Sequence, residues 1–311
     1  MIYLRPIGGI CNRVRAFDSA LQLAEIKHQK LTVIWVQNPD LNASFESIFN
    51  EIKSPVLQRV INVVPGTTLK QKVISKVLNR IETPTKNIGF NAWINKLALK
   101  IILKDFGIKK VFNNNDFVQL IHEIDDRDKM TGIAYETAFL NKIDSITSQI
   151  DASGSYFIET CYRLLPLTGK EYYKDFIPAS ALQEQINTYE IGSDTIGVHI
   201  RRTDHHYAKE SSPNEVFEKV IREHLTLNDA ANVLLCSDDQ SVKDYFKTVF
   251  GDKIMTIKVN SFDRNDPKAI NDAIIELYLL SKTKKIFGSH FSSFSQIAAD
   301  IGGIPLETLK K

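Results

Sequence analysis

The chain of 311 residues is poor in cysteine. Its three cysteines, Cys11, Cys161 and Cys236, lie far apart, and an odd number at such spacing suits neither a disulfide framework nor a zinc site. No apolar run approaches the roughly twenty residues that a membrane-spanning helix needs. The first residues, 1–6, also lack the basic segment and long apolar run of a signal peptide. We therefore expect a reducing, cytoplasmic compartment and no membrane span.

The sequence also lacks a strong charge of either sign, and the net charge of +2 says little about partners. We expect no nucleic acid among them. The distribution is uneven, because Leu69–Lys110 holds ten Lys or Arg against two acids. Apolar residues recur there at helical spacing, which predicts basic amphipathic helices. We favour core-facing helices with a solvated basic face; the alternative is peripheral contact with the inner face of an anionic membrane or with a glycolipid.

The second half of the chain alternates between predicted strands and helices. The strands are Thr195–Ile200, Asn232–Cys236, Lys253–Lys258 and Lys285–Gly288, and the helices are Pro213–Leu225, Asp239–Phe250, Pro267–Ser281 and a last one from Ser293. Such alternation, with nearly continuous apolar strands, predicts a parallel sheet that is covered on both faces.

The first half begins in the same way. A strand at Ile2–Leu4, a glycine turn, a helix at Arg13–Lys27 and a strand at Leu31–Val36 precede the helical insertion, and Tyr156–Cys161 is predicted as the last strand. Breaks near Leu167–Tyr172 place the domain boundary there. We expect two facing α/β domains, 1–170 and 171–311, with ligands beyond the carboxyl ends of the strands.

The strongest motif runs from Gly197 through His199, Arg201 and Arg202 to Asp204, where a buried strand leads directly into two arginines and a carboxylate. The guanidinium group is a planar fork of donors that matches phosphate oxygens and stays charged, which suits a departing diphosphate. The alternative is an Arg–Asp pair that pins a loop to the sheet. Two arginines at a strand end favour the diphosphate interpretation.

Two further motifs fit anion sites at helix starts. Gly288–Ser295 contains Ser292 and Ser293 before an apolar helix, and one serine would suffice for capping. The loop from Gly8 and Gly9 to Asn12 and Arg13 lets a backbone approach a ligand closely. This loop is neither a G-x-G-x-x-G fingerprint nor a P-loop, and a plain tight turn is its alternative interpretation.

Carboxylates supply the remaining candidates. Asp238 and Asp239 follow a predicted strand, where they could bind a ribose or base, bind a metal, or cap the next helix. We consider the metal interpretation the weaker one. Glu276 flanks the apolar stripe of its predicted helix and could equally be a solvent-facing acid.

Taken together, the motif from His199 to Asp204, the Ser-Asp-Asp at 237–239, the segment around Glu276 and the Phe-Ser-Ser at 291–293 resemble the α-1,6-fucosyltransferase and protein O-fucosyltransferase superfamily, over about Thr195 to Gly303. The resemblance implies an α/β, GT-B-like fold with two facing Rossmann-like domains and a helical insertion in the N-terminal one. It also implies inverting, metal-independent transfer from GDP-fucose, with no cofactor, to a glycan hydroxyl.

The same resemblance implies roles for single residues. Arg201 and Arg202 would bind the donor diphosphate, Asp204 would orient their loop, and Ser292 and Ser293 would hold the β-phosphate. Further donor-binding candidates are Gly8, Gly9, Asn12, Arg13, His199, Asp238, Asp239 and Glu276.

The sequence departs from the superfamily's pattern after Asp204. Relatives in the α-1,6 branch carry a lysine directly after this aspartate and a glutamate a few residues later, whereas this chain has His205 and Lys209, with Glu210 next. The general base is thus open between Glu210, His205, His206 and the donor's own phosphate. Two other functions remain open: a transferase for another nucleotide sugar, and a non-catalytic nucleotide- or glycan-binding protein of the same fold.

Overall fold

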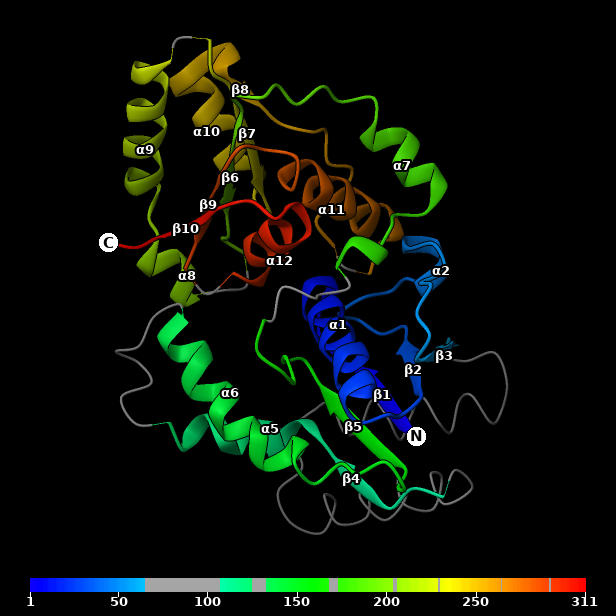
Figure 1. The fold of residues 1–311 in the computed structure, drawn as a ribbon. Helices are drawn as coiled ribbons and strands as arrows, with labels where there is room; N and C mark the ends of the chain where they lie inside the picture. Colours follow the sequence, from blue (N-terminus) through cyan, green and yellow to red (C-terminus); the bar gives the residue numbers. More distant parts are fainter. Residues whose placement is uncertain are drawn as a thin grey trace. The chain divides into compact units, whose positions relative to one another are not determined.

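The computed structural model describes residues 1–64, 107–124, 133–167, 173–203, 206–228, 230–263, 265–290 and 292–311. Most of the predicted basic insertion at 69–110 lies outside these residues. The chain divides into two compact units, Met1–Ile177 and Pro178–Lys311 (Figure 1). The sequence placed this boundary after residue 170, slightly earlier in the chain.

The N-terminal unit contains a five-stranded parallel sheet in the order β3-β2-β1-β5-β4. Its elements are β1 (Ile2–Pro6), α1 (Ile10–Ile26), β2 (Leu31–Val36), α2 (Phe45–Ile48), β3 (Leu57–Val63), β4 (Lys110–Phe112), α5 (Asn114–His122), α6 (Ile133–Thr147), β5 (Tyr156–Thr160) and the 3₁₀ turn Tyr173–Asp175.

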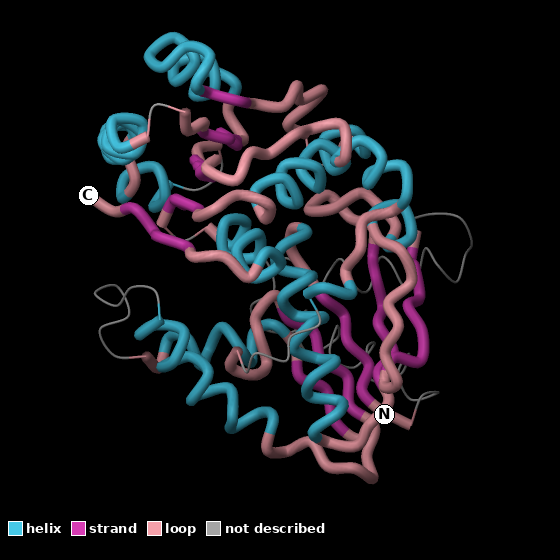
Figure 2. Tube along the Cα trace, turned by 45° about the horizontal axis from the view of Figure 1, so that its top comes forward, coloured by secondary structure: helices cyan, strands magenta, loops and turns pink. Residues whose placement is uncertain are grey.

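The C-terminal unit contains a second five-stranded parallel sheet, in the order β10-β9-β6-β7-β8. Helices alternate with its strands (Figure 2). The elements are α7 (Ser180–Ile186), β6 (Ile196–Ile200), α8 (His206–Ser211), α9 (Asn214–Leu227), β7 (Val233–Ser237), α10 (Gln240–Phe250), the 3₁₀ turn Gly251–Lys253, β8 (Ile254–Met255), α11 (Pro267–Leu280), β9 (Ile286–Ser289), α12 (Ser293–Gly302) and β10 (Leu306–Leu309).

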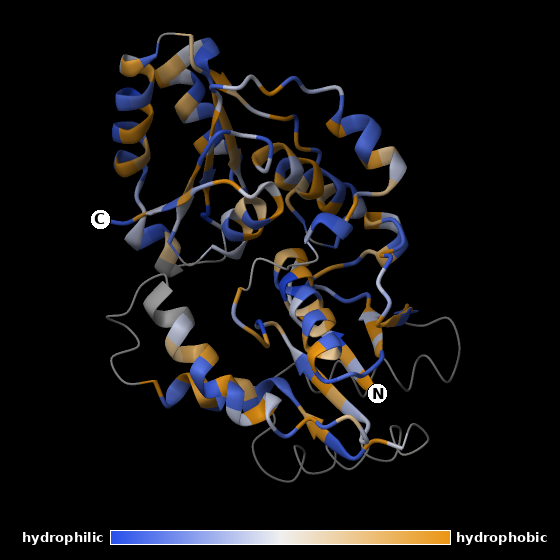
Figure 3. Cartoon of the chain, viewed as in Figure 1, coloured by the Kyte–Doolittle hydropathy of each residue, from blue (hydrophilic) through white to orange (hydrophobic). Residues whose placement is uncertain are grey.

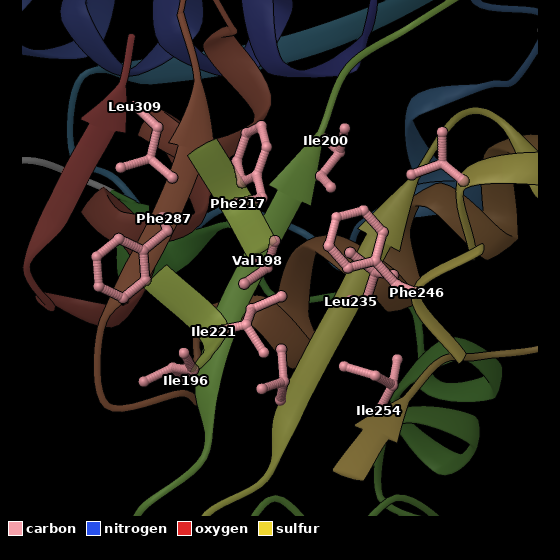
Figure 4. Close-up of a cluster of buried hydrophobic side chains, with 12 residues drawn as sticks. Ile196, Val198, Ile200, Phe217, Ile221, Leu235, Phe246, Ile254, Phe287 and Leu309 are labelled. Atoms are coloured by element: carbon pink, nitrogen blue, oxygen red, sulfur yellow. The ribbon is translucent and has the colours of Figure 1, made fainter. Parts of the chain in front are cut away.

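The side chains of β6 point alternately to the two faces of the C-terminal sheet. Ile196, Val198 and Ile200 belong to a cluster of buried apolar side chains together with residues of α9 and α10 (Figure 4). Side chains alternate between the faces of a strand, so Gly197 and His199 lie on the other side. A Cβ at Gly197 would come within 2.8 Å of Leu280 in α11. Helices thus cover both faces of this sheet.

The helix α9 shows how the sequence pattern produces this packing. Its buried residues, Phe217 and Ile221, are four positions apart and therefore project from the same face. Apolar and polar residues alternate along the helix in Figure 3. The predicted strands and helices of the C-terminal half are all present, although β8 is shorter than expected and β10 was not predicted. Among the described residues, no helix combines the length and apolarity needed to cross a bilayer.

Candidate functional site

The strand order of the C-terminal unit defines a topological switch point between β6 and β9. From β6 the chain proceeds outward through β7 and β8, and it then returns to the other side of β6 to form β9 and β10. In open parallel sheets, ligands bind beyond the carboxyl ends of the two strands at such a point. Arg201 follows β6 and Ser292 follows β9. The fold therefore brings two of the sequence motifs to one edge of the sheet.

Arg201 lies at this edge with part of its side chain accessible. The side chain is 20% exposed, and its Nη1 lies 2.8 Å from Oδ2 of Asp238, which follows β7. Its backbone N–H donates to Oγ of Ser289, the last residue of β9, at 3.0 Å. Arg201 is therefore fixed to both neighbouring strands.

Asp238 organises the loop that leaves β6. Its carboxylate accepts the backbone N–H of Arg202 at 2.7 Å and that of Thr203 at 3.2 Å, together with the Thr203 hydroxyl at 2.6 Å. Burial acts to raise the pKa of Asp238, but Arg201 and these donors outweigh it, so the net pKa is lowered. An Arg–Asp pair that pins the loop to the sheet thus exists between Arg201 and Asp238, the residue after β7.

His199 connects the end of β6 to the start of α12. Its Nδ1 lies 3.3 Å from Oγ of Ser292, and its ring stacks on Phe294 with a centroid distance of 4.7 Å. Burial lowers the pKa of His199 to about 3, with Arg201 and Lys243 acting in the same direction and Asp238 against them. The imidazole is therefore neutral at physiological pH, and it serves as a spacer between the two motifs.

The free energy of unfolding should depend on pH because of this buried, neutral histidine. Because the pKa of His199 is lowered by folding, its stabilising contribution is complete above a pH of about 6.5 and is lost as the pH falls toward 3. We expect His199→Gln to flatten the decline of the unfolding free energy below pH 6.5, by up to about 1.4 kcal/mol per pH unit. Urea unfolding of both proteins between pH 4 and 7 measures this difference. Parallel curves would contradict the assignment.

The first turn of α12 has no side-chain cap. Ser292 occupies the N-cap position, yet its side chain makes no capping hydrogen bond, and its hydroxyl is near His199 instead. The N–H groups of a helix's first turn have no intrahelical partners and attract anions. Gly288 of β9 lets the first turn of α12 pack closely on the strand, since a Cβ at Gly288 would lie only 2.6 Å from the Cβ of Ser295. Ser293 begins the helix and is partly exposed.

A buried ion pair connects α10 to α11. Lys243 of α10 and Glu276 of α11 are 1% and 7% exposed, and Nζ lies 2.5 Å from Oε1. Burial raises the pKa of Glu276 to about 7 although the lysine acts against this, and it raises the pKa of the buried Cys236 thiol. The solvent-facing interpretation of Glu276 is therefore wrong. Sequence reasoning missed Lys243, because a lysine beside an apolar helical stripe usually extends to solvent.

Two predicted donor-binding residues of this unit have structural roles. Arg202 is 8% exposed, and its guanidinium donates to the backbone oxygen of Arg201 at 2.8 Å and to Oδ1 of Asn214 at 2.6 Å. It holds the loop against the start of α9. Asp239 is the N-cap of α10 and accepts the backbone N–H of Ser241 at 2.9 Å. In this structure Arg202 therefore anchors its loop and Asp239 caps α10, while the predicted diphosphate role of Arg202 and nucleoside role of Asp239 stay predictions.

The glycine loop of the N-terminal unit follows β1, which neighbours β5 at that sheet's own switch point. Gly8 has a φ of +78°, a conformation that favours glycine, and Gly9 is the N-cap of α1. Arg13 is 1% exposed and donates to the backbone oxygens of Gly8 and Val36 at 2.7 and 2.6 Å. Arg13 therefore anchors the loop to β2 in this structure, and its predicted role as a ligand residue stays a prediction.

Asn12 keeps a partly exposed position in this loop. Its Oδ1 accepts a hydrogen bond from Nη2 of Arg15 at 3.0 Å, and the same guanidinium donates to the backbone oxygen of Cys161 at 2.8 Å. Arg15 was missed by sequence reasoning; its spacing of three residues from Asn12 within one helix was the available signal.

The base candidates are only partly described. Asp204 and His205 lie outside the described residues, as does the side chain of His206, while Glu210 is exposed on α8. Within the described part of the chain, no group of three or more His, Cys, Asp or Glu side chains could hold a metal ion.

Comparisons with known proteins support the fold. No protein-family model matches the chain, and no curated protein matches it. Among solved structures, the chain is similar to the α-1,6-fucosyltransferase NodZ co-crystallised with GDP, with a TM-score of 0.58, 16% identity and coverage of 96% of this chain and 91% of that one. Fucosyltransferase NodZ from Bradyrhizobium gives a TM-score of 0.58 and 16% identity, with coverages of 96% and 92%. A NodZ structure soaked with GDP-fucose gives 0.55 and 15%, with coverages of 96% and 91%.

At such identity the likeness establishes the fold. The predicted α/β class, with two Rossmann-like domains, is confirmed by the two parallel sheets and by the agreement over nearly the whole chain. The chain therefore shares its fold with these NodZ structures.

Proposed function

We propose that this protein is a glycosyltransferase that transfers a sugar from a nucleotide diphosphate donor, GDP-fucose, to a glycan hydroxyl. The observation that carries the proposal is the meeting of Arg201 and the Ser292 helix start at the β6–β9 switch point, bridged by His199. The NodZ structures with GDP and GDP-fucose support the choice of donor.

The roles of Arg201 and the α12 start follow from the charge that develops on the leaving diphosphate. As the bond between the anomeric carbon and the diphosphate oxygen breaks, negative charge accumulates on the diphosphate. A guanidinium and a helix start that are already held in place stabilise this charge more in the transition state than in the ground state. Asp238 supplies that preorganisation, because it fixes Arg201 together with the backbone of its loop.

The acceptor hydroxyl attacks the anomeric carbon from the side opposite the leaving diphosphate, so the configuration inverts. Its proton passes to a base, for which Glu210, His205, His206 and a donor phosphate oxygen are the candidates. Arg201 and the α12 start supply positive charge to the leaving group, so we propose that transfer needs no metal and continues in the presence of EDTA. The acceptor is a glycan or glycolipid.

Thermal unfolding with GDP, UDP and ADP tests the donor. A nucleotide that binds only the folded state stabilises it by about 2.7 kcal/mol at a hundred times its Kd. We expect GDP to raise the melting temperature more than UDP or ADP at equal concentration. A larger shift with UDP or ADP would assign another nucleotide sugar. Binding of GDP without consumption of GDP-fucose across a panel of glycan acceptors would indicate the non-catalytic function.

A further inference from the structure

The loop between β8 and α11 carries an exposed aromatic ring that the diphosphate site does not use. Phe262 is 42% exposed. One face of its ring is near Lys243, whose Nζ lies 5.8 Å from the ring centroid, a distance typical of a cation–π contact. A large part of the ring is left open to solvent. Single exposed apolar residues are common, so the surroundings of the ring decide whether it has a function.

The backbone beside Phe262 is held in place. Asn260 donates its backbone N–H to Oδ2 of Asp272 at 2.6 Å and its side-chain amide to both oxygens of the same carboxylate at 3.1 Å. Asp272 lies on α11 and is 6% exposed. A buried carboxylate that accepts three hydrogen bonds anchors the loop two residues before the ring. A loop that is already anchored loses less conformational entropy when a ligand binds, so binding costs less free energy.

The ring is also connected to the diphosphate site through the sheet edge. Lys243 lies in the first turns of α10, which begins directly after Asp238 and Asp239, and its charge acts on His199 and Cys236. β8 is the second strand from β6, so the two loops are separated by about two strand spacings, roughly 10 Å. An extended nucleoside diphosphate covers such a length between its terminal phosphate and its base.

We propose that Phe262 is the platform on which the nucleoside base of the donor stacks. This assignment rests on the proposed function and adds the residue that binds the other end of the donor. Stacking on an aromatic face accepts any base, because every base has a π face. Phe262 thus contributes affinity, while polar groups elsewhere select the base.

Titration of the full chain with GDP tests the platform. Phe262→Ala should raise the Kd for GDP about tenfold or more, as the loss of one base–aromatic stack does. Phe262→Leu should behave like the alanine variant, whereas Phe262→Trp should bind GDP as well as the wild type. Tyr245→Ala is a matched control, since Tyr245 is also 42% exposed and lies on α10; it should leave the Kd unchanged.

The outcomes separate the two proposals. Equal Kd values for the wild type and Phe262→Ala overturn the platform and leave the proposed function standing. A wild-type chain that binds none of GDP, UDP and ADP overturns both. Melting temperatures without nucleotide identify a folding defect. If Phe262→Leu loses GDP binding and Phe262→Trp binds GDP as well as the wild type, the site requires an aromatic ring, and stacking is supported.

Discussion

Replacing Arg201 with alanine is expected to lower kcat for sugar transfer by about 10²–10³, which corresponds to roughly 3–4 kcal/mol of barrier. The reason is that Arg201 brings a preorganised charge to the departing diphosphate at the switch point. Folding should change little, since Asp238 keeps its bonds to the Arg202 and Thr203 backbone and to the Thr203 hydroxyl. We expect a loss of about 1–2 kcal/mol of unfolding free energy for the charged hydrogen bond. Turnover of GDP-fucose and urea unfolding measure the two effects.

Two further variants make this test specific. Arg201→Lys keeps a positive charge but loses the planar fork, so it should restore only part of the activity. Arg222→Ala is the control, because Arg222 is another ion-paired arginine of the same unit, 59% exposed on α9. It should keep full activity. An Arg201→Ala enzyme with near wild-type kcat would remove the diphosphate role.

Replacing Lys243 with alanine is expected to produce the largest loss of stability in the C-terminal unit, roughly 3–5 kcal/mol. The substitution removes the ammonium that lies 2.5 Å from the buried Glu276 carboxylate. The carboxylate then has to protonate or draw water into the core. Chemical denaturation at pH 8 measures the loss, because the pKa of Glu276, raised to about 7 even with the lysine present, leaves the carboxylate largely ionised there.

The double variant Lys243→Met/Glu276→Leu tests whether the cost comes from an uncompensated charge. Both charges are removed together, so most of the stability should return. The pH dependence has a definite sign as well. Because folding raises the pKa of Glu276, its protonated form stabilises the folded state below a pH of about 4.5, and this contribution is lost as the pH rises through 7. Lys243→Ala should therefore lose less stability at pH 4 than at pH 8, and equal losses would contradict the assignment.

Much of the fold could be predicted from the sequence because its signals are local. The β6 and β7 strands are short apolar runs, and α9 shows buried residues at helical spacing. Pro267 and Asp266 mark the start of α11, where Asp266 accepts the N–H of Lys268 at 2.9 Å. The edge strand β10, at Leu306–Leu309, has a mixed pattern with two exposed positions. Its pairing with β9 depends on tertiary contacts that a single-sequence pattern does not contain.

The location of the candidate site could be predicted from the sequence, but the contacts between its side chains could not. Arg201 and Ser292 were found because charged and hydroxyl residues followed apolar strands, and strand ends gather at one edge of a parallel sheet. Which carboxylate binds which arginine depends on the directions of side chains that lie far apart in the sequence, as for Arg201 and Asp238. Sequence adjacency suggested Asp204 for this role, and Asp204 lies outside the described residues. The same limit hid the pair of Lys243 and Glu276, whose partners are 33 residues apart.

The alternation along β6 has a consequence for how the protein can change. Odd-numbered positions, Gly197 and His199, lead to the chemistry, and even-numbered positions, Ile196, Val198 and Ile200, build the interior. Insertion or deletion of one residue would exchange the two sets, placing an imidazole among apolar side chains and isoleucine at the switch point. Point substitutions can alter one set while sparing the other, whereas a change of length damages both together. A change in the length of this strand is therefore more damaging than a substitution on either of its sides.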